Sequence, residues 1–239
     1  MSGHSKWATI HRKKGLIDAE RGKIFQKLAK EIMVATKAGS PDPKENASLR
    51  LAVEKAKAQN MPKDKIEYAI KKASGADSSL NYEEVRYEGY GPGGVAFMVD
   101  CLTDNKNRTA SQVRAAFTKA GGNLGTDGSV SYIFEKKGII EIHKEYNEED
   151  MMMASLDAGA IDFESGDDSY VITTDSTNFL NVKKSLEDAG VKEFIECNLT
   201  YIPNMEVSLD EEAVEKVLKL VDTLEDLDDV NEVYYNLGE

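Results

Sequence analysis

The fold is decided by two similar stretches of sequence, Ser155-Leu156-Asp157-Ala158-Gly159 and Ser185-Leu186-Glu187-Asp188-Ala189-Gly190. Each ends a segment with the hydrophobic period of a helix, and each helix stands between two strand-like segments. Any two helices before strands can end in Ala-Gly, but two successive strand–helix–strand units of this length predict a ferredoxin-like domain. The predicted strands are 139–142, 161–164, 170–173 and 193–199, and the predicted helices are 148–158 and 177–189.

The sequence on both sides of this repeat predicts a second α+β domain. Before it we expect strands at 85–88 and 95–102, joined by Gly89-Tyr90-Gly91-Pro92-Gly93-Gly94, then a helix at 109–120 and a strand at 129–134. After it we expect a helix at 210–224 and a strand at 231–235. This tail is too short to fold alone, so it should return to the sheet begun near residue 82, with the ferredoxin-like domain inserted in a loop.

The first 75 residues have a helical pattern. Asp18 can cap a helix that runs to about Ala38, with Gly39 as a left-handed stop, and further helices are expected at 44–59 and 62–75. Short amphipathic helices predict a small bundle. The chain is therefore expected to be α+β, an N-terminal helical bundle followed by two α+β domains, one ferredoxin-like and inserted in the other. The expected domains are 1–78, 82–136 with 200–239, and 137–199.

Charge is segregated along the 239 residues. Residues 1–80 hold 17 Lys and Arg against 9 Asp and Glu, a net charge of +8, whereas the remainder holds 13 against 34, a net charge of −21. The overall net charge of −13 hides this division. A charge run is often only a solvated face, but an asymmetry of this size predicts a basic module attached to an acidic body.

The basic module supplies the candidate nucleic-acid-binding residues. Cations without matching carboxylates neutralise phosphates and give affinity without sequence choice. The only tryptophan, Trp7, can stack on a base or pack the first helix onto the bundle, and the connection 60–64 can project toward a partner or form a plain turn between helices. The candidates are His4, Lys6, Trp7, Arg12, Lys13, Lys14, Arg21, Lys23, Lys27, Lys30, Lys57, Lys63 and Lys65, and Lys55, Lys71 and Lys72 extend the second patch.

Nothing in the sequence points to catalysis. The three histidines form no HxxxH or HExxH motif, the run 89–94 is followed by a strand instead of a phosphate-binding helix, and no G-x-S-x-G motif is present. The two cysteines lie far apart without a CxxC motif, which suits a reducing compartment. We expect a non-enzymatic cytoplasmic protein with no cofactor, no metal site and no membrane span.

Several long motifs resemble the YebC family, in the same order and over nearly the whole chain. They are Gly3-His4-Ser5-Lys6-Trp7, Arg21-Gly22-Lys23-Ile24-Phe25, Asn60-Met61-Pro62-Lys63-Asp64, Tyr87-Glu88-Gly89-Tyr90-Gly91-Pro92-Gly93-Gly94, Thr103-Asp104-Asn105-Lys106-Asn107-Arg108-Thr109, Gly121-Gly122-Asn123-Leu124-Gly125 and Gly128-Ser129-Val130. The resemblance implies a helical domain followed by two α+β domains. It also implies either a DNA-binding transcriptional regulator or, as described for some members and mitochondrial relatives, a translational activator at the ribosome.

Two functional hypotheses stay open on the sequence. The first, a DNA-binding regulator, follows the family, although no helix-turn-helix spacing is evident. The second is a ribosome-associated translation factor whose basic module contacts ribosomal RNA and whose acidic domains contact basic proteins, a use for the −21 charge that DNA binding lacks. An acidic adaptor that binds only proteins leaves the basic module unexplained. The oligomeric state is not predicted.

Overall fold

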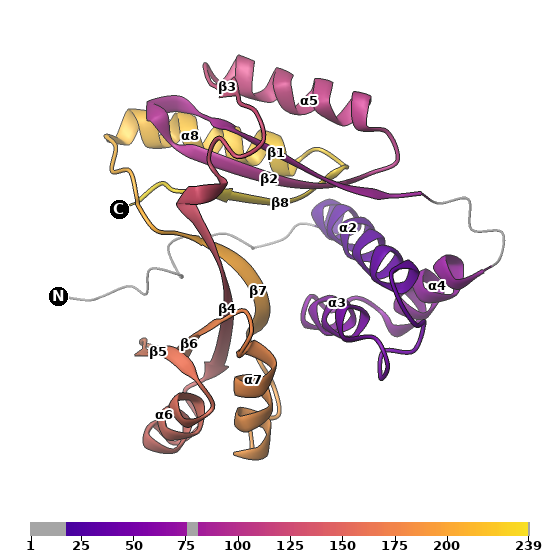
Figure 1. Cartoon of the computed structure of the whole chain (residues 1–239), viewed down its shortest axis with the longest axis vertical. Coiled ribbons are helices and arrows are strands. Elements are labelled where there is room, and N and C mark those ends of the chain that lie inside the picture. The colour runs from indigo at the N-terminus through magenta and orange to yellow at the C-terminus, as the bar shows by residue number, and fades with distance from the viewer. Residues whose placement is uncertain (1–17, 76–80, 239) are drawn as a thin grey trace. The chain divides into compact units, whose positions relative to one another are not determined.

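The computed structural model describes residues 18–75 and 81–238, with side chains from Gly22 onward. It divides into two compact units (Figure 1). Among the described residues, the larger unit contains residues 18–56, 61–135 and 202–238, and the smaller one contains Lys136–Tyr201 together with Lys57–Asn60. Within the described ranges, no helix has both the length and the apolar character required to cross a membrane.

The N-terminal part of the larger unit is a helical bundle, as the period predicts. Its helices are α2 (Asp18–Lys37), α3 (Ala47–Ala58) and α4 (Lys63–Ser74). They share one apolar core, in which Ile32, Leu49 and Ala69 are fully buried. The apolar positions of α4 recur every three or four residues, so one side of that helix is buried and the opposite side faces solvent.

The end of α2 differs from the expectation. Gly39 does not adopt a left-handed conformation. Instead the side chain of Asn46, which is buried, donates from Nδ2 to the carbonyl oxygens of Ala35 (2.8 Å) and Ser40 (2.9 Å). Its Oδ1 accepts from the backbone N–H of Leu49, so it also caps α3. A Cβ at position 39 would lie 2.9 Å from Asn46 Nδ2, so glycine is needed there for close approach.

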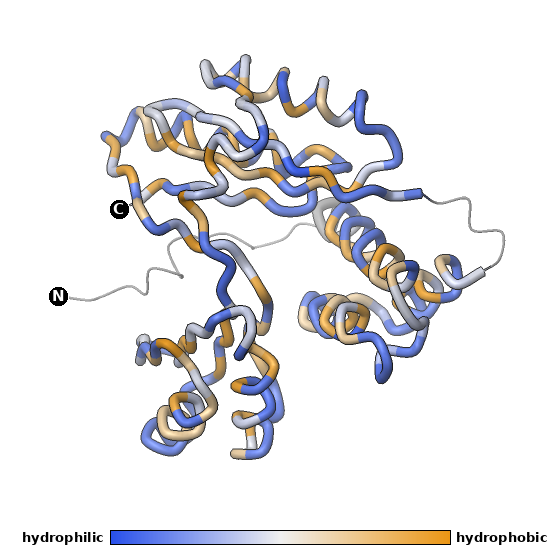
Figure 2. Tube along the Cα trace, viewed as in Figure 1, coloured by the Kyte–Doolittle hydropathy of each residue, from blue (hydrophilic) through white to orange (hydrophobic). Residues whose placement is uncertain are grey.

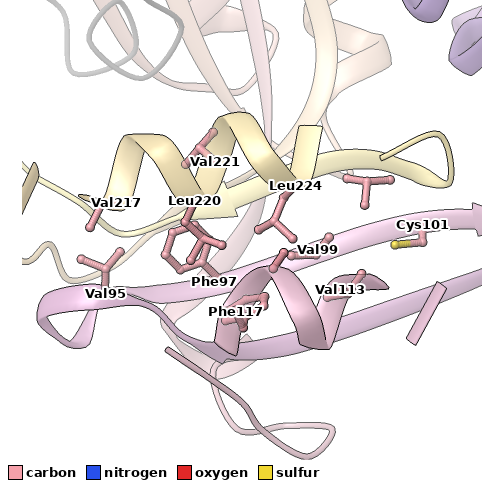
Figure 3. Packing of buried hydrophobic residues seen from close by; sticks show 12 residues of the cluster. Val95, Phe97, Val99, Cys101, Val113, Phe117, Val217, Leu220, Val221 and Leu224 are labelled. Carbon is pink, nitrogen blue, oxygen red and sulfur yellow. The ribbon is translucent and has the colours of Figure 1, made fainter. Parts of the chain in front are cut away.

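The first sheet has the strand order β3-β1-β2-β8. Its strands are β1 (Glu83–Tyr90), β2 (Ala96–Thr103), β3 (Asn123–Leu124) and β8 (Val230–Tyr235). Because β8 pairs with β2, the C-terminal end of the chain completes a sheet begun 147 residues earlier, at Glu83, as expected. Phe97 and Val99 of β2 pack against α5 (Lys106–Lys119) and α8 (Glu211–Glu225), which cover the same face (Figure 3).

Two connections of this sheet contain short 3-10 helices. The turn after β1 contains a short 3-10 helix, η1 (Pro92–Gly94), in which Gly93 has a positive φ of 68°. The strand expected at 129–134 is wrong, since Ser131–Ile133 form a 3-10 helix, η2. The buried carboxylate of Glu88 explains this, because it accepts the backbone N–H groups of Gly128, Val130 and Ser131 and so draws them away from a ladder.

The second sheet has the order β5-β6-β4-β7, which in chain order is 2-3-1-4 and is ferredoxin-like. Its elements are β4 (Phe134–His143), α6 (Glu148–Asp157), β5 (Ala160–Ser165), β6 (Ser169–Asp175), α7 (Phe179–Asp188) and β7 (Glu196–Pro203). Ile140, Ile172 and Phe179 are fully buried. The predicted α+β fold class, with a ferredoxin-like part inserted in the other, is therefore confirmed.

The predicted domain boundaries remain a prediction. Contacts group the helical bundle and the first sheet in one compact unit. The inserted part is compact between Lys136 and Tyr201.

Candidate nucleic-acid interface

The lysines of α2 contact the segment that connects α8 to β8. Lys23 Nζ lies 3.0 Å from the Asp226 carboxylate. Lys27 Nζ donates to the carbonyl oxygen of Glu225 at 2.6 Å. Burial lowers the pKa of the Lys27 amino group, and the nearby acidic side chains offset this only in part. Lys23 and Lys27 therefore have partners within the chain.

Asp229 joins this segment to several elements. Its side chain is 4% exposed, and its oxygens accept from Lys30 Nζ (3.1 Å), Thr109 Oγ1 (2.9 Å) and the guanidinium of Arg108 (3.1 Å from Nε). Burial alone would raise the pKa of Asp229, but the hydrogen bonds from Arg108, Thr109 and Lys30 outweigh it and hold the pKa below the usual range. Lys30 also donates to the carbonyl oxygen of Asp228 at 2.8 Å.

Lys55 of α3 makes a similar contact with β8. Its Nζ lies 2.8 Å from Glu31 and 2.6 Å from Glu232. Burial opposes the charged form of Lys55, but the two carboxylates overcome it and raise the pKa above the ordinary value. Asn231 donates to the same Glu31 oxygen at 3.0 Å.

These contacts correct the expectation that the basic module lacks matching carboxylates. Asp226 and Asp229 supply them to Lys23 and Lys30. The partners lie about 200 residues away in sequence, so a count of charges within residues 1–80 could not identify them. The sequence predicts that Lys23, Lys27 and Lys30 bind nucleic acid, and no observation tests that prediction. Because all three have partners within the chain, we do not include them in the interface that we propose.

The outward side of α4 exposes cations around an aromatic ring. We call Lys65, Tyr68, Lys71 and Lys72 the α4 surface; all four are exposed. Positions 65, 68 and 72 follow one another at helical spacing and so form one stripe. Tyr68 is 63% exposed, and Lys72 Nζ lies 5.9 Å from the centre of its ring. Lys65 Nζ lies 5.0 Å from the ring of Phe25.

Tyr68 is not among the candidate residues predicted from the sequence. The signal was present, since the buried positions Ile66, Ala69 and Ala73 define the inner side of α4 and Tyr68 falls outside it. An aromatic ring on an outward helical position beside lysines is a candidate surface for stacking a base.

The other candidates lie in several places. Lys57 is exposed in the last turn of α3, and Lys63 is exposed at the start of α4, with its Nζ 3.5 Å from Glu67. The connection 60–64 is a turn between helices, because Asn60 has a positive φ of 57°, Met61 is buried, and Met61 N–H donates to Ala56 O. His4, Lys6, Trp7, Arg12, Lys13 and Lys14 lie outside the described residues, as does the side chain of Arg21.

The described residues include neither a reactive thiol at Cys101 nor a metal cluster. Burial is the main reason that the pKa of Cys101 is raised to about 12, so its thiol stays protonated. Among the described residues, no cluster of three or more His, Cys, Asp or Glu side chains has the geometry to hold a metal ion.

Comparisons with known proteins agree along the whole chain. Residues 5–76 match the model of the "TACO1/YebC protein N-terminal domain", and residues 82–237 match that of the "TACO1/YebC second and third domain". A protein of Geobacillus kaustophilus is 55% identical over 242 residues, covering 100% of this chain and 98% of the relative. One of Geobacter sulfurreducens is 52% identical, covering 99% and 95%. Both are named probable transcriptional regulatory proteins.

A solved structure is also similar. The crystal structure of a conserved hypothetical protein from Aquifex aeolicus superimposes with a TM-score of 0.85 at 48% sequence identity. The alignment covers 98% of this chain and 96% of that one.

Proposed function

Because this chain belongs to the TACO1/YebC family, we propose that it is a non-enzymatic regulatory protein that binds DNA through its basic helical module. The names of its relatives support a role in transcriptional regulation. The observation that carries the proposal is the α4 surface, where Lys65, Lys71 and Lys72 are exposed. Cations of this kind can neutralise phosphates and release counterions.

The proposed interface includes residues from two parts of the module. From the described part we take the α4 surface together with Lys57 and Lys63, all on α3 or α4. On the strength of the sequence alone we add His4, Lys6, Trp7, Arg12, Lys13, Lys14 and Arg21. No recognition helix is assigned, so we expect affinity that depends strongly on salt and little on sequence.

Titration of labelled duplex DNA at several salt concentrations tests this proposal. For the Lys71→Glu/Lys72→Glu variant we expect weaker binding and a log–log salt slope smaller by roughly 0.9 for each lost cation. Lys184→Glu/Lys192→Glu is the matched control, since it reverses two exposed lysines in the smaller unit. If both variants bind DNA as the unaltered chain does, the α4 surface is not the contact.

A second candidate function is favoured by Tyr68. Its exposed ring suits an unpaired base, and structured RNA such as ribosomal RNA offers unpaired bases, whereas duplex DNA keeps its bases stacked. In this reading the protein is a ribosome-associated translation factor. Acidic side chains of the same chain could then contact basic ribosomal proteins.

The Tyr68→Ala variant separates the two functions. Loss of one base–aromatic stack should weaken binding to a single-stranded loop by about 1–3 kcal/mol and leave duplex binding unchanged. Crosslinking in cells, followed by sequencing of the attached nucleic acid, identifies the physiological target. Recovery of ribosomal RNA would support the translation factor, and recovery of promoter DNA would support the transcriptional regulator.

A further inference from the structure

The outer edge of the second sheet exposes a group of apolar side chains. Strand β5 is the edge strand in the order β5-β6-β4-β7, so among the described residues one side of its backbone has no neighbouring strand. On α6 and β5, large apolar side chains remain 36–60% exposed. We call these residues the β5 edge surface: Met152, Met153, Leu156 and Ile161. Figure 2 shows hydrophobic residues in both elements.

These side chains lie on the side of α6 that faces away from α7. Ser185 of α7 donates to the carbonyl oxygen of Ala154 at 2.8 Å, which fixes the flank of α6 that α7 covers. Met152 and Leu156 are each two positions from Ala154, and at 100° per residue they point to the opposite flank. Because α6 leads directly into β5 and packs along it, this flank borders the open edge of the sheet (Figure 1).

The segment that contains the apolar group is acidic. Residues 144–168 contain one lysine and nine Asp and Glu, a net charge of −8. On β5, Asp162 and Glu164 are exposed and alternate with Phe163, whose ring packs 5.2 Å from that of Tyr170. Within the described part of the chain neither carboxylate takes part in an ion pair. The edge therefore has an apolar border on one face and unpaired negative charge on the other.

We propose that β5 binds an extended Lys- and Arg-rich segment of another protein as an added strand. An exposed strand edge offers unpaired backbone N–H and C=O groups to such a segment. In an added strand, successive side chains point to opposite faces. Alternate apolar side chains then contact Met152 and Leu156, where methionine adapts to varied shapes, and the intervening cations face Asp162 and Glu164.

The negative charge at β5 favours a basic protein segment over a second copy of the chain and over nucleic acid. A second copy of the chain would place the carboxylates of one β5 opposite those of the other, and like charges across a strand pair are destabilising. Nucleic acid would meet a region of net charge −8 and be repelled. A basic, partly apolar protein segment fits both the charge and the apolar border. This contact goes beyond the proposed function and does not depend on it.

Binding of a synthetic peptide to the full chain tests the charge component. The probe is a fluorescent twelve-residue peptide of alternating lysine and valine, and a glutamate–valine peptide is its control. We expect the lysine peptide to bind and the glutamate peptide not to bind. The Asp162→Lys/Glu164→Lys variant should bind the lysine peptide about tenfold more weakly. Glu211→Lys/Glu215→Lys on α8 is the matched variant, since it also reverses two exposed carboxylates. Equal weakening by the two variants would mean binding by net charge alone and would overturn the proposal.

The apolar component and the place of binding need separate readouts. We expect Leu156→Ser to weaken binding of the lysine peptide several-fold. Leu180→Ser, at a similarly exposed position on α7, should leave the binding affinity unchanged. Hydrogen exchange should show that the peptide protects amides of β5. Protection of β7, the other edge strand of the sheet, in place of β5 would overturn the proposal. So would a dimer in sedimentation that Asp162→Lys/Glu164→Lys dissociates, because the occupant would then be a second copy.

Discussion

Asp229 holds together parts of the chain that are far apart in sequence. It accepts hydrogen bonds from Thr103 at the end of β2, from Arg108 and Thr109 at the start of α5, and from Lys30 of α2. A buried carboxylate is tolerated only when it is paired and hydrogen-bonded, and removal of one partner leaves buried polar groups without a match. Together with Asp226 and the carbonyl oxygens of Glu225 and Asp228, Asp229 gives the lysines of α2 their partners at the end of α8.

We expect Asp229→Ala to lower the free energy of unfolding by about 3 kcal/mol, because Lys30 and Thr109 lose a shared buried acceptor. Urea unfolding at pH 7, followed by circular dichroism, measures the change. The neighbouring Asp228→Ala is the control, since that side chain is exposed and should alter stability by less than about 0.5 kcal/mol. Similar effects of the two substitutions would contradict a structural role for the Asp229 network.

Glu88 predicts how stability depends on pH. Burial alone would raise the pKa of Glu88, but the backbone N–H groups of Val130, Gly128 and Ser131 outweigh it and lower the pKa. A carboxylate with a lower pKa in the folded chain contributes stability above its unfolded-state pKa of about 4, and that stability is lost as the pH falls through the folded pKa.

The Glu88→Gln variant tests this dependence. It should be less stable than the unaltered chain at pH 7, and the difference should shrink as the pH falls below about 4 and disappear below the lowered folded-state pKa of Glu88. Urea unfolding between pH 7 and pH 3 measures both effects. Glu84→Gln, on an exposed position of the same strand, should follow the unaltered chain throughout. A constant difference at every pH would show that the charge of Glu88 is not the cause.

At the scale of elements, hydrophobic period predicts the helices and most strands well. The expected helix at 62–75 is α4, and the expected strands at 95–102 and 231–235 are β2 and β8 within a residue or so. Two of the errors occur where a side chain elsewhere in the sequence decides the backbone: Asn46 ends α2 in place of a left-handed Gly39, and Glu88 binds the backbone N–H groups at 128–131. Such side-chain-to-backbone contacts leave no periodic signal in the sequence.

The pairing of β3 with β1 depends on a glycine that has no room for a side chain. A Cβ at Gly122 would lie 2.5 Å from the backbone carbonyl oxygen of Tyr90, so the two strands would have to separate. We expect Gly122→Ala to destabilise the chain by about 2 kcal/mol. Gly121 has a positive φ of 80° and open space around it, so Gly121→Asn should cost less than about 1 kcal/mol. Thermal unfolding compares the two variants, and the reverse order would refute the argument.

At the scale of the whole molecule, charge segregation in the sequence has two different uses. Some N-terminal lysines, such as Lys30 and Lys55, pair with carboxylates of the C-terminal segment and stabilise the larger unit. Others, such as Lys71 and Lys72, stay exposed on α4. Composition predicts that a basic module exists but cannot assign each lysine to one use, because the assignment depends on which side chains the fold brings together.

A comparison of two single substitutions tests this division. Lys30→Ala removes the partner of a buried carboxylate, so it should lower the free energy of unfolding by about 2–3 kcal/mol and leave the salt slope of DNA binding unchanged. Lys72→Ala removes an exposed cation, so it should change stability by less than about 0.5 kcal/mol and reduce the salt slope by roughly 0.9. Denaturation and DNA titration of the same preparations give both quantities. If Lys30→Ala reduced the salt slope as Lys72→Ala does, the α2 lysines would also contact DNA, and the contacts with Asp226 and Asp229 would have to open on binding.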